Sequence, residues 1–499
     1  MAASTRPQYY SNTLKVIDIR EGALVRARAE LQSAVDRGLV LVSEQSPPID
    51  NHGNIFTGGL GIACLHLYRI YQAITSGKDE QDIQKLVEAA ERYTPKEIPA
   101  ELTFANGRTS PLCHTELGVI FIQMALRLVR GMHPAFRDDK ADPKSGPQGT
   151  ELSDSTSHFN FLWEVNRGSG EAIWHTRMQG KSVESNGHLM GIDEVLCGRA
   201  GLLWACVLRN RLYRVLSQGV DFRDADEHVV VDRLMSRDTT DLIGILHLHG
   251  LPTHTPSSPE PPEPPPYSWP WIDDWHALGG MHGAAGIMAA MFQADYADFR
   301  TPMTVPRSIG QSVPALTSFF EHTMDTLCQT CLDNDGHLPM SKPPFPSKNK
   351  NANPLVQICH GTPGLLLMLA SARRNKEFRS KHWKPLWNEA FAIGSHRVWA
   401  EGLISKGAGI CHGIAGNALP WLMWVEIDVD EGWSTAPHLE RALAFLKECM
   451  NTKPFSEDLE DKYRMPDHPY SLFEGLAGTV LVWMEAVRIL DKMLSKAAS

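Results

Sequence analysis

The feature that most constrains the fold is a short glycine motif that recurs seven times along the chain. In six copies two glycines are separated by two residues and followed by an apolar run, and the remaining copy keeps only the second glycine. Successive copies are 57, 83, 85, 78, 52 and 62 residues apart, which is enough for two helices and their loops in each interval. The second glycines are Gly61, Gly118, Gly201, Gly286, Gly364, Gly416 and Gly478.

The runs that follow the motifs are apolar on nearly all sides, which predicts buried helices. Stretches between the motifs, such as Asp82–Arg92 and His438–Met450, are amphipathic, and strand signals are sparse. One Gly-x-x-Gly alone is more often a helix cap, but an ordered series favours a repeat architecture. We therefore predict an all-α chain: an α/α toroid of seven inner and seven outer helices. In this toroid the glycines let the inner helix N-termini crowd around a common mouth.

The domain organisation follows from the repeats rather than from length. A chain of 499 residues would suggest two or three domains, whereas the repeats predict a single domain over residues 1–499. Two segments are interpreted as loop insertions: the polar residues 137–157 and the proline-rich residues 254–271.

Composition excludes several classes of protein. The net charge of −10 argues against a nucleic-acid partner, and nine cysteines in so long a chain do not suggest a disulfide framework. The first residues carry no secretory signal, and no apolar run approaches the ~20 residues that span a bilayer. We predict a cytoplasmic protein with no transmembrane segment and with free thiols. Cys328 and Cys331, spaced C-x-x-C in a helical stretch without a second pair, are interpreted as core cysteines.

Two copies of the motif carry a Cys-His pair directly before the first glycine: Cys359-His360 and Cys411-His412. Each pair offers a thiolate and an imidazole, the ligands that zinc prefers, at the start of a predicted helix. A single pair would more often be a buried cysteine beside a helix cap. Two pairs in neighbouring repeats favour a metal site.

The motifs and their order resemble those of the LanC-like proteins, relatives of the lantibiotic cyclases, over nearly the whole chain. The matching stretches read TGGLGIACLHLY, DEVLCGRAGLL, HGAAGI, CHGTPG, KGAGICHGIAGN and RMPDHPYSLFEGLAGT. The resemblance implies an α/α toroid around one zinc ion. In lantibiotic cyclases this zinc activates a peptide cysteine for addition to a dehydroamino acid. In the eukaryotic LanC-like group the implied thiol is that of glutathione, added to dehydroalanine or dehydrobutyrine residues of damaged proteins.

The resemblance implies Cys359, Cys411 and His412 as the zinc ligands. Three protein ligands leave one tetrahedral position open, as in catalytic zinc sites. An incoming thiol in that position would lose its proton at neutral pH and become a nucleophile.

The predicted catalytic residues are three. His282 precedes its motif glycine as His360 and His412 do, so repeat symmetry places it at the same mouth, where an imidazole can transfer a proton. Asp193 matches a family acid near the metal and would orient His282 or stabilise developing charge; an ordinary helix-start aspartate is the alternative. His360 matches a family position beside the first zinc cysteine and would act as an acid or support the metal site.

Three cations match family positions that contact glutathione: Lys406, Arg464 and, more loosely, Arg6. Fixed cations at the rim suit a ligand with two carboxylates. Without the resemblance, a single lysine or arginine is more often a solvated surface charge.

These residues together predict a zinc-dependent glutathione transferase whose partners are glutathione and peptides or proteins containing dehydroamino acids. The first alternative is a non-catalytic zinc- and glutathione-binding sensor or adaptor that contacts signalling proteins or membranes through its outer helices. The second is a glycoside-processing α/α barrel, which needs two paired inward carboxylates. The sequence pairs none of the carboxylates in or beside the motifs, which are Glu116, Asp193, Glu194 and Glu474.

Overall fold

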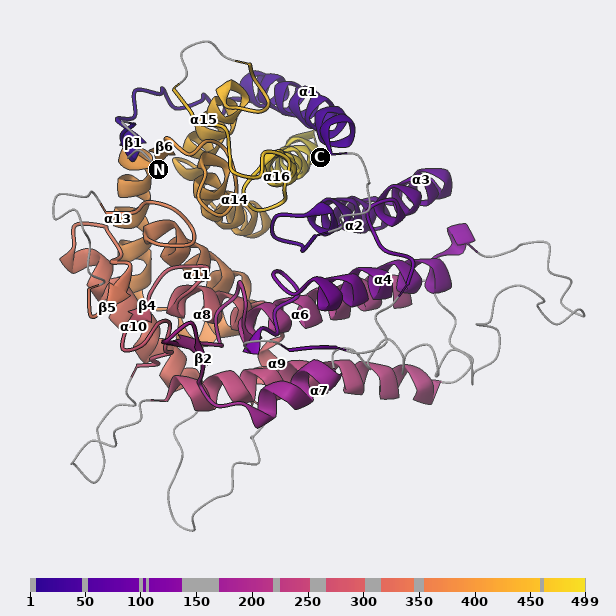
Figure 1. Cartoon of the computed structure of the whole chain (residues 1–499). Coiled ribbons are helices and arrows are strands. Elements are labelled where there is room, and N and C mark those ends of the chain that lie inside the picture. Colours follow the sequence, from indigo (N-terminus) through magenta and orange to yellow (C-terminus); the bar gives the residue numbers. More distant parts are fainter. Residues whose placement is uncertain are drawn as a thin grey trace, which may run out of the picture.

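Helices dominate the computed structural model of the chain, and the strands are short (Figure 1). The prediction of a mostly helical protein is thus confirmed. The structure describes residues 6–46, 53–97, 102–104, 107–136, 170–218, 225–251, 266–300, 316–344, 354–457 and 462–498.

Each glycine motif is followed by a helix. These motif helices are α2 (Gly59–Thr75), α4 (Thr115–Met132), α6 (Arg199–Ser217), α8 (Ala284–Phe292), α11 (Thr362–Arg374), α14 (Ile414–Glu431) and α16 (Leu476–Ala498). The other α-helices are α1 (Glu21–Gln45), which precedes them, and α3 (Glu80–Glu91), α7 (Ala225–Gly250), α9 (Tyr296–Arg300), α10 (Leu316–Asp333), α12 (Lys376–His382), α13 (Pro385–Glu401) and α15 (His438–Glu448), which lie between them in the chain. Residues 170–178 are also helical, and η2 (Pro134–Phe136) and η3 (Cys449–Asn451) are short 3₁₀ turns.

The motif helices pack against one another in chain order, from α2 to α4, α6, α8, α11, α14 and α16, and α16 contacts α2. The first and last repeats therefore meet, and α1 lies along α16 (Figure 1). Several of the other helices cover a motif helix: α3 lies on α2, α7 on α6, α13 on α11 and α15 on α14. The division into seven inner and seven outer helices stays a prediction.

Burial separates the two kinds of helix as the apolar patterns predict. Every residue of α8 is buried. In α3 the buried residues are Ile83, Val87 and Ala90, which lie on one face at helical spacing. The motif helices therefore supply much of the core, and covering helices such as α3 contribute one face each.

The second glycine of each motif lies in the first turn of its helix, against the loop that precedes it. A Cβ atom on Gly416 would lie 1.8 Å from the carbonyl oxygen of Ile410, and one on Gly286 would lie 2.0 Å from that of Gly280. No side chain fits at these distances, so glycine is required where the loop folds back on the helix. The first glycine is the N-cap residue of five motif helices: Gly58, Gly198, Gly283, Gly361 and Gly413.

The loops before the motif helices are joined by backbone hydrogen bonds in a closed circuit, because each loop donates to the next one in chain order and the last donates to the first. This circuit gathers the N-terminal ends of the motif helices at one end of the molecule. The donor and acceptor residues are Phe56 to Leu112 (2.9 Å), Ser110 to Cys197 (3.1 Å), Val195 to Met281 (3.1 Å), Gly280 to Ile358 (2.8 Å), Cys359 to Cys411 (3.1 Å), Cys411 to Phe473 (2.8 Å) and Phe473 to Phe56 (3.3 Å).

The strands form three antiparallel pairs among the described residues. They are β1 (Tyr9–Tyr10) with β6 (Leu403–Ile404), β2 (Ser182–Ser185) with β3 (His188–Gly191), and β4 (His276–Ala277) with β5 (Ser341–Lys342). The first pair fastens the N-terminal segment to the chain just before α14.

The two predicted insertions fall largely outside the described residues. Residues 137–157 and 254–265 are not among them. The end of the proline-rich segment is described, and there Tyr267 and Trp269 are buried, with the Trp269 indole donating to the Leu246 carbonyl at 2.9 Å. This end is therefore part of the core rather than a solvated loop, because its aromatic side chains outweigh its prolines. No helix in the described part of the chain is long and apolar enough to cross a membrane.

Candidate active site

Cys359, Cys411 and His412 meet at the mouth formed by the motif loops. Their ligand atoms all lie within 4.8 Å of one another, and both cysteines are buried. The backbone bond from Cys359 to Cys411 sets the two loops side by side. This group can hold a metal ion, and two thiolates with one imidazole are a donor set that suits zinc.

The two thiols share one strong interaction. A hydrogen bond with Cys411 holds the pKa of Cys359 well below its ordinary value, against the effect of burial, and His412 adds a further hydrogen bond. The same bond, together with burial, raises the pKa of Cys411. One thiolate is therefore favoured even without a metal, and metal binding would displace the second proton.

Gln357 links Cys359 to a predicted substrate-binding cation. Its side-chain amide donates to the Cys359 sulfur at 3.2 Å, and its carbonyl oxygen accepts from Lys406 Nζ at 3.3 Å. Lys406 thus lies at the edge of the cysteine site. Gln357 has no motif signal of its own, so sequence reasoning missed it.

Glu474 faces the imidazole of His412. Its Oε1 lies 3.9 Å from His412 Nε2, and its Oε2 lies 2.6 Å from His468 Nδ1. The 3.9 Å distance to His412 is too long for a hydrogen bond, so Glu474 acts on the His412 ring through its charge. The sequence identified Glu474 only as one of several carboxylates in or beside the motifs and assigned it no role at the metal site.

His282 has a carboxylate partner of its own, Glu194, whose Oε2 lies 2.5 Å from His282 Nδ1. Burial acts to lower the pKa of His282, but the charge and hydrogen bond of Glu194 outweigh it, so the pKa is raised. The His282 ring stacks on His360, with centroids 5.0 Å apart at 21°. The structure therefore brings the two predicted catalytic histidines together.

Asp193 occupies a different environment from its neighbour Glu194. It is fully buried, accepts from Arg199 Nη1 at 2.7 Å and lies 3.3 Å from His249 Nδ1. Arg199 also donates to the backbone carbonyls of Thr176 and nearby residues. The orienting position beside His282 thus belongs to Glu194 and not to Asp193. Any role of Asp193 in the reaction stays a prediction.

His360 is held neutral by its surroundings. Burial is the main cause that lowers its pKa to about 4. Its buried Nδ1 has no hydrogen-bond partner among the described residues. Trp271 lies beside both histidines, with its ring centroid 5.4 Å from that of His360 and 5.7 Å from that of His282.

The segments that carry the three predicted substrate-binding cations run side by side. The Ser405 amide donates to the Gln8 carbonyl at 3.1 Å, and the Arg464 amide donates to the Ser405 carbonyl at 3.0 Å. Residue 6 lies two positions before Gln8 in the chain, and Lys406 directly follows Ser405. The Arg464 guanidinium reaches Asp467 at 3.2 Å. The backbone therefore gathers all three segments near the cysteine site.

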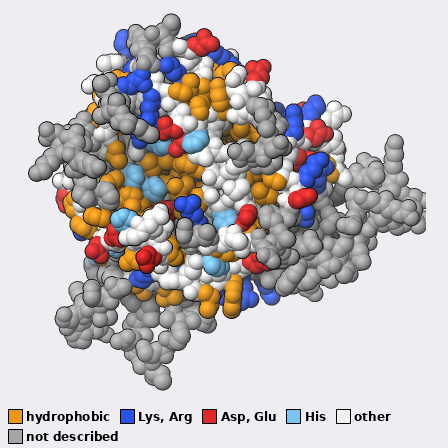
Figure 2. Space-filling view, in the orientation of Figure 1, with side chains coloured by type: hydrophobic (Ala, Val, Ile, Leu, Met, Phe, Trp, Pro, Cys, Tyr) orange, Lys and Arg blue, Asp and Glu red, His pale blue; other side chains and the backbone are white. Residues whose placement is uncertain are grey.

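The floor of the site is apolar. Phe56 and Met281 form a small buried cluster with the two cysteines, separate from the main core. Phe56 also stacks on Phe473, with centroids 4.9 Å apart. Figure 2 shows histidine side chains among apolar ones near the middle of the face seen in Figure 1.

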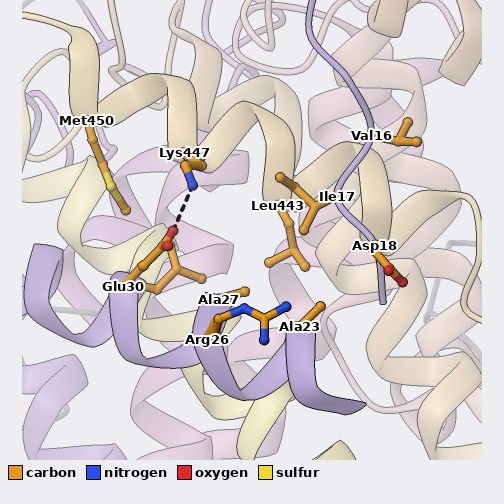
Figure 3. A pocket seen from close by; sticks show the side chains of 11 residues that line it. Val16, Ile17, Asp18, Ala23, Arg26, Ala27, Glu30, Leu443, Lys447 and Met450 are labelled. Atoms are coloured by element: carbon orange, nitrogen blue, oxygen red, sulfur yellow. Dashed lines mark hydrogen bonds and ion pairs between the residues drawn. The ribbon is translucent and has the colours of Figure 1, made fainter. Parts of the chain in front are cut away.

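A cavity of about 250 Å³ lies elsewhere, between residues 16–18, α1 and α15 (Figure 3). Its lining includes Arg26, Leu443 and the ion pair of Lys447 with Glu30 at 2.9 Å. None of the predicted site residues line it.

Comparison with known proteins identifies the family. The chain matches the model of lanthionine synthetase C-like proteins over residues 171–489, more than half of its length, and it belongs to this family. It is 39% identical to zebrafish (Danio rerio) glutathione S-transferase LANCL1 over 126 residues, which are 25% of this chain and 27% of that protein. It is 26% identical to the Arabidopsis thaliana LanC-like protein GCL1 over 315 residues, 62% of this chain and 58% of that protein. The chain thus matches less than two thirds of either relative.

Proposed function

We propose that this protein is a zinc-dependent glutathione transferase that adds the glutathione thiol to dehydroalanine or dehydrobutyrine residues of peptides and proteins. The observation that carries the proposal is the Cys359–Cys411–His412 group beside the Glu194–His282 pair. The name of the zebrafish relative agrees with it. The order of helix contacts supports the α/α toroid that the repeats predict.

The proposed division of labour follows the geometry. Cys359, Cys411 and His412 hold one zinc ion, which would lower the pKa of the incoming thiol. Lys406 and Arg464 bind the glutathione carboxylates, and Arg6, on the neighbouring segment, joins them. A reducing cytoplasm would keep glutathione and the site cysteines in the thiol form.

His282 supplies the proton in this proposal. The glutathione sulfur forms a bond to the β-carbon, and the double-bond electrons move to the α-carbon and its carbonyl as an enolate. Protonated His282 then gives its proton to the α-carbon, and the proton released by the thiol restores it. Glu194 stabilises the protonated imidazole, and His360 stacks on its ring.

The proposal is tested by incubating the protein with glutathione and a dehydrobutyrine peptide and following thioether formation by mass spectrometry. The expected product is the peptide plus one glutathione, absent with Cys411→Ala and retained with Cys64→Ala, a cysteine of α2 outside the site. Tight glutathione binding with no product on any dehydro-peptide would contradict the enzyme and favour the sensor or adaptor.

A further inference from the structure

Trp271 joins the two histidines of the site in one aromatic group. Its ring lies 5.4 Å from that of His360 and 5.7 Å from that of His282, and the two imidazoles stack on each other at 5.0 Å. Neither the motif pattern nor the family resemblance singles out this tryptophan. A substrate group that packs against His282 would therefore also contact the indole of Trp271.

The β2–β3 hairpin fixes the backbone of Trp271. The Gly191 amide donates to the Trp271 carbonyl at 2.8 Å, and the Trp271 amide donates to the Trp275 carbonyl at 2.9 Å. A Cβ atom on Gly191 would lie 1.8 Å from the Pro270 carbonyl oxygen, so only glycine allows this approach. The backbone that carries the indole is thus fixed by a short, tight contact with the hairpin.

A second clip holds the turn that follows Trp271. The Asp273 carboxylate accepts from the Leu189 amide at 2.9 Å and lies 2.8 Å from His188 Nδ1. The Asp273 amide donates to the Leu189 carbonyl at 2.7 Å. Two sets of hydrogen bonds to the β2–β3 hairpin therefore fix the loop that carries Trp271. A rigid surface of this kind is what recognition needs.

The surroundings decide which chemical group fits there. Phe56, Met281 and Phe473 supply an apolar floor beside the stacked rings of His282 and His360. A planar, conjugated acyl group can pack on an indole, and an uncharged one keeps favourable contact with the apolar floor.

We propose that Trp271 is the specificity-determining wall for the electrophile: its indole holds the planar unsaturated residue against His282. This inference rests on the proposed transferase function. The glutathione-binding cations lie on other segments, so Trp271 acts on the electrophile and not on glutathione.

The test is steady-state kinetics of Trp271→Ala and Trp271→Leu with both substrates varied. We expect kcat/KM for the dehydrobutyrine peptide to fall by about tenfold or more, mainly through KM, with the KM for glutathione changed less than about twofold. Trp271→Phe keeps an aromatic ring and should retain most of the wild-type kcat/KM for the peptide. Trp174→Ala, an exposed tryptophan of residues 170–178, should behave as wild type.

The outcomes separate the two claims. If the wild type forms no thioether, the proposed function fails. If the wild type is active and Trp271→Leu keeps the wild-type KM for the peptide, this inference is wrong and the function stands. Because leucine keeps side-chain bulk without the ring, this variant decides the question even if Trp271→Ala does not fold. Equal increases in both KM values would also overturn it, since they indicate a general loss of site structure.

Discussion

Glu194 Oε2 lies 2.5 Å from Nδ1 of His282, whereas the adjacent Asp193 is buried against Arg199. Two neighbouring carboxylates therefore have different tasks. Glu194 raises the pKa of His282 at the site, and Asp193 neutralises the buried Arg199.

Glu194→Gln should reduce thioether formation by about 10- to 100-fold at pH 8, because protonated His282 is the proposed acid. Glu194 raises the pKa of His282, so removing the carboxylate lowers that pKa. As the pH is raised, the variant should therefore lose activity at a lower pH than the wild type does. The pH profile of kcat measures this. Glu184→Gln, on the exposed face of the β2–β3 hairpin, is the control, and an unshifted profile for Glu194→Gln would exclude the pairing.

Asp193→Ala should act on stability instead. Both side chains of the Asp193–Arg199 pair are almost fully buried, so removing one leaves an uncompensated charge. We expect the free energy of unfolding to fall by about 3–5 kcal/mol, measured by urea denaturation. In the fraction that remains folded, the pH profile should match the wild type. A stable variant with a shifted profile would instead assign Asp193 a catalytic role.

Glu474→Gln should weaken zinc binding by up to about 10-fold, because the negative charge that faces the His412 imidazole is lost. Competition with a chromogenic chelator gives the affinity. Glu485→Gln, which removes an ion pair of α16 with Arg488, is the matched control. Unchanged zinc affinity in Glu474→Gln would mean that the charge of Glu474 does not contribute to metal binding.

His247 should make the fold acid-sensitive. Burial lowers its pKa to about 4, below the ordinary 6.5, so the unfolded chain binds the proton more tightly. Stability is then fully present above about pH 6.5 and is lost as the pH falls toward 4, by at most about 3 kcal/mol for this residue. Urea midpoints at pH 7 and pH 4.5 should differ less for His247→Gln than for the wild type. Equal losses in both would show that other groups dominate acid unfolding.

The sequence predicted the helices well because the repeated glycines mark where each motif helix starts. The two Cys-His pairs predicted a metal site, since a motif carried by adjacent repeats returns to the same mouth, and the resemblance selected Cys359, Cys411 and His412, which the structure brings together. The sequence assigned the acid beside His282 to Asp193, whereas Glu194 occupies that position. Two adjacent acids at a helix start look alike until burial separates them.

Residues outside the repeat pattern could not be found in this way. Gln357 and Trp271 reach the site from loops, and each is also hydrogen-bonded to a segment far away in the chain, Gln357 to Lys406 and Trp271 to Gly191. The burial of Tyr267 and Trp269 at the end of the proline-rich segment could not be predicted for a similar reason, because the local composition does not reveal the helices on which they pack.

The most direct test of the account is metal removal and return. The rate of thioether formation from glutathione and a dehydrobutyrine peptide is measured for the purified protein, for the same protein after chelation, and after one equivalent of zinc is added back. We expect a rate at background after chelation and recovery with zinc in the wild type and in Cys64→Ala, but no recovery in Cys411→Ala. A metal-free protein that keeps the full rate would contradict it.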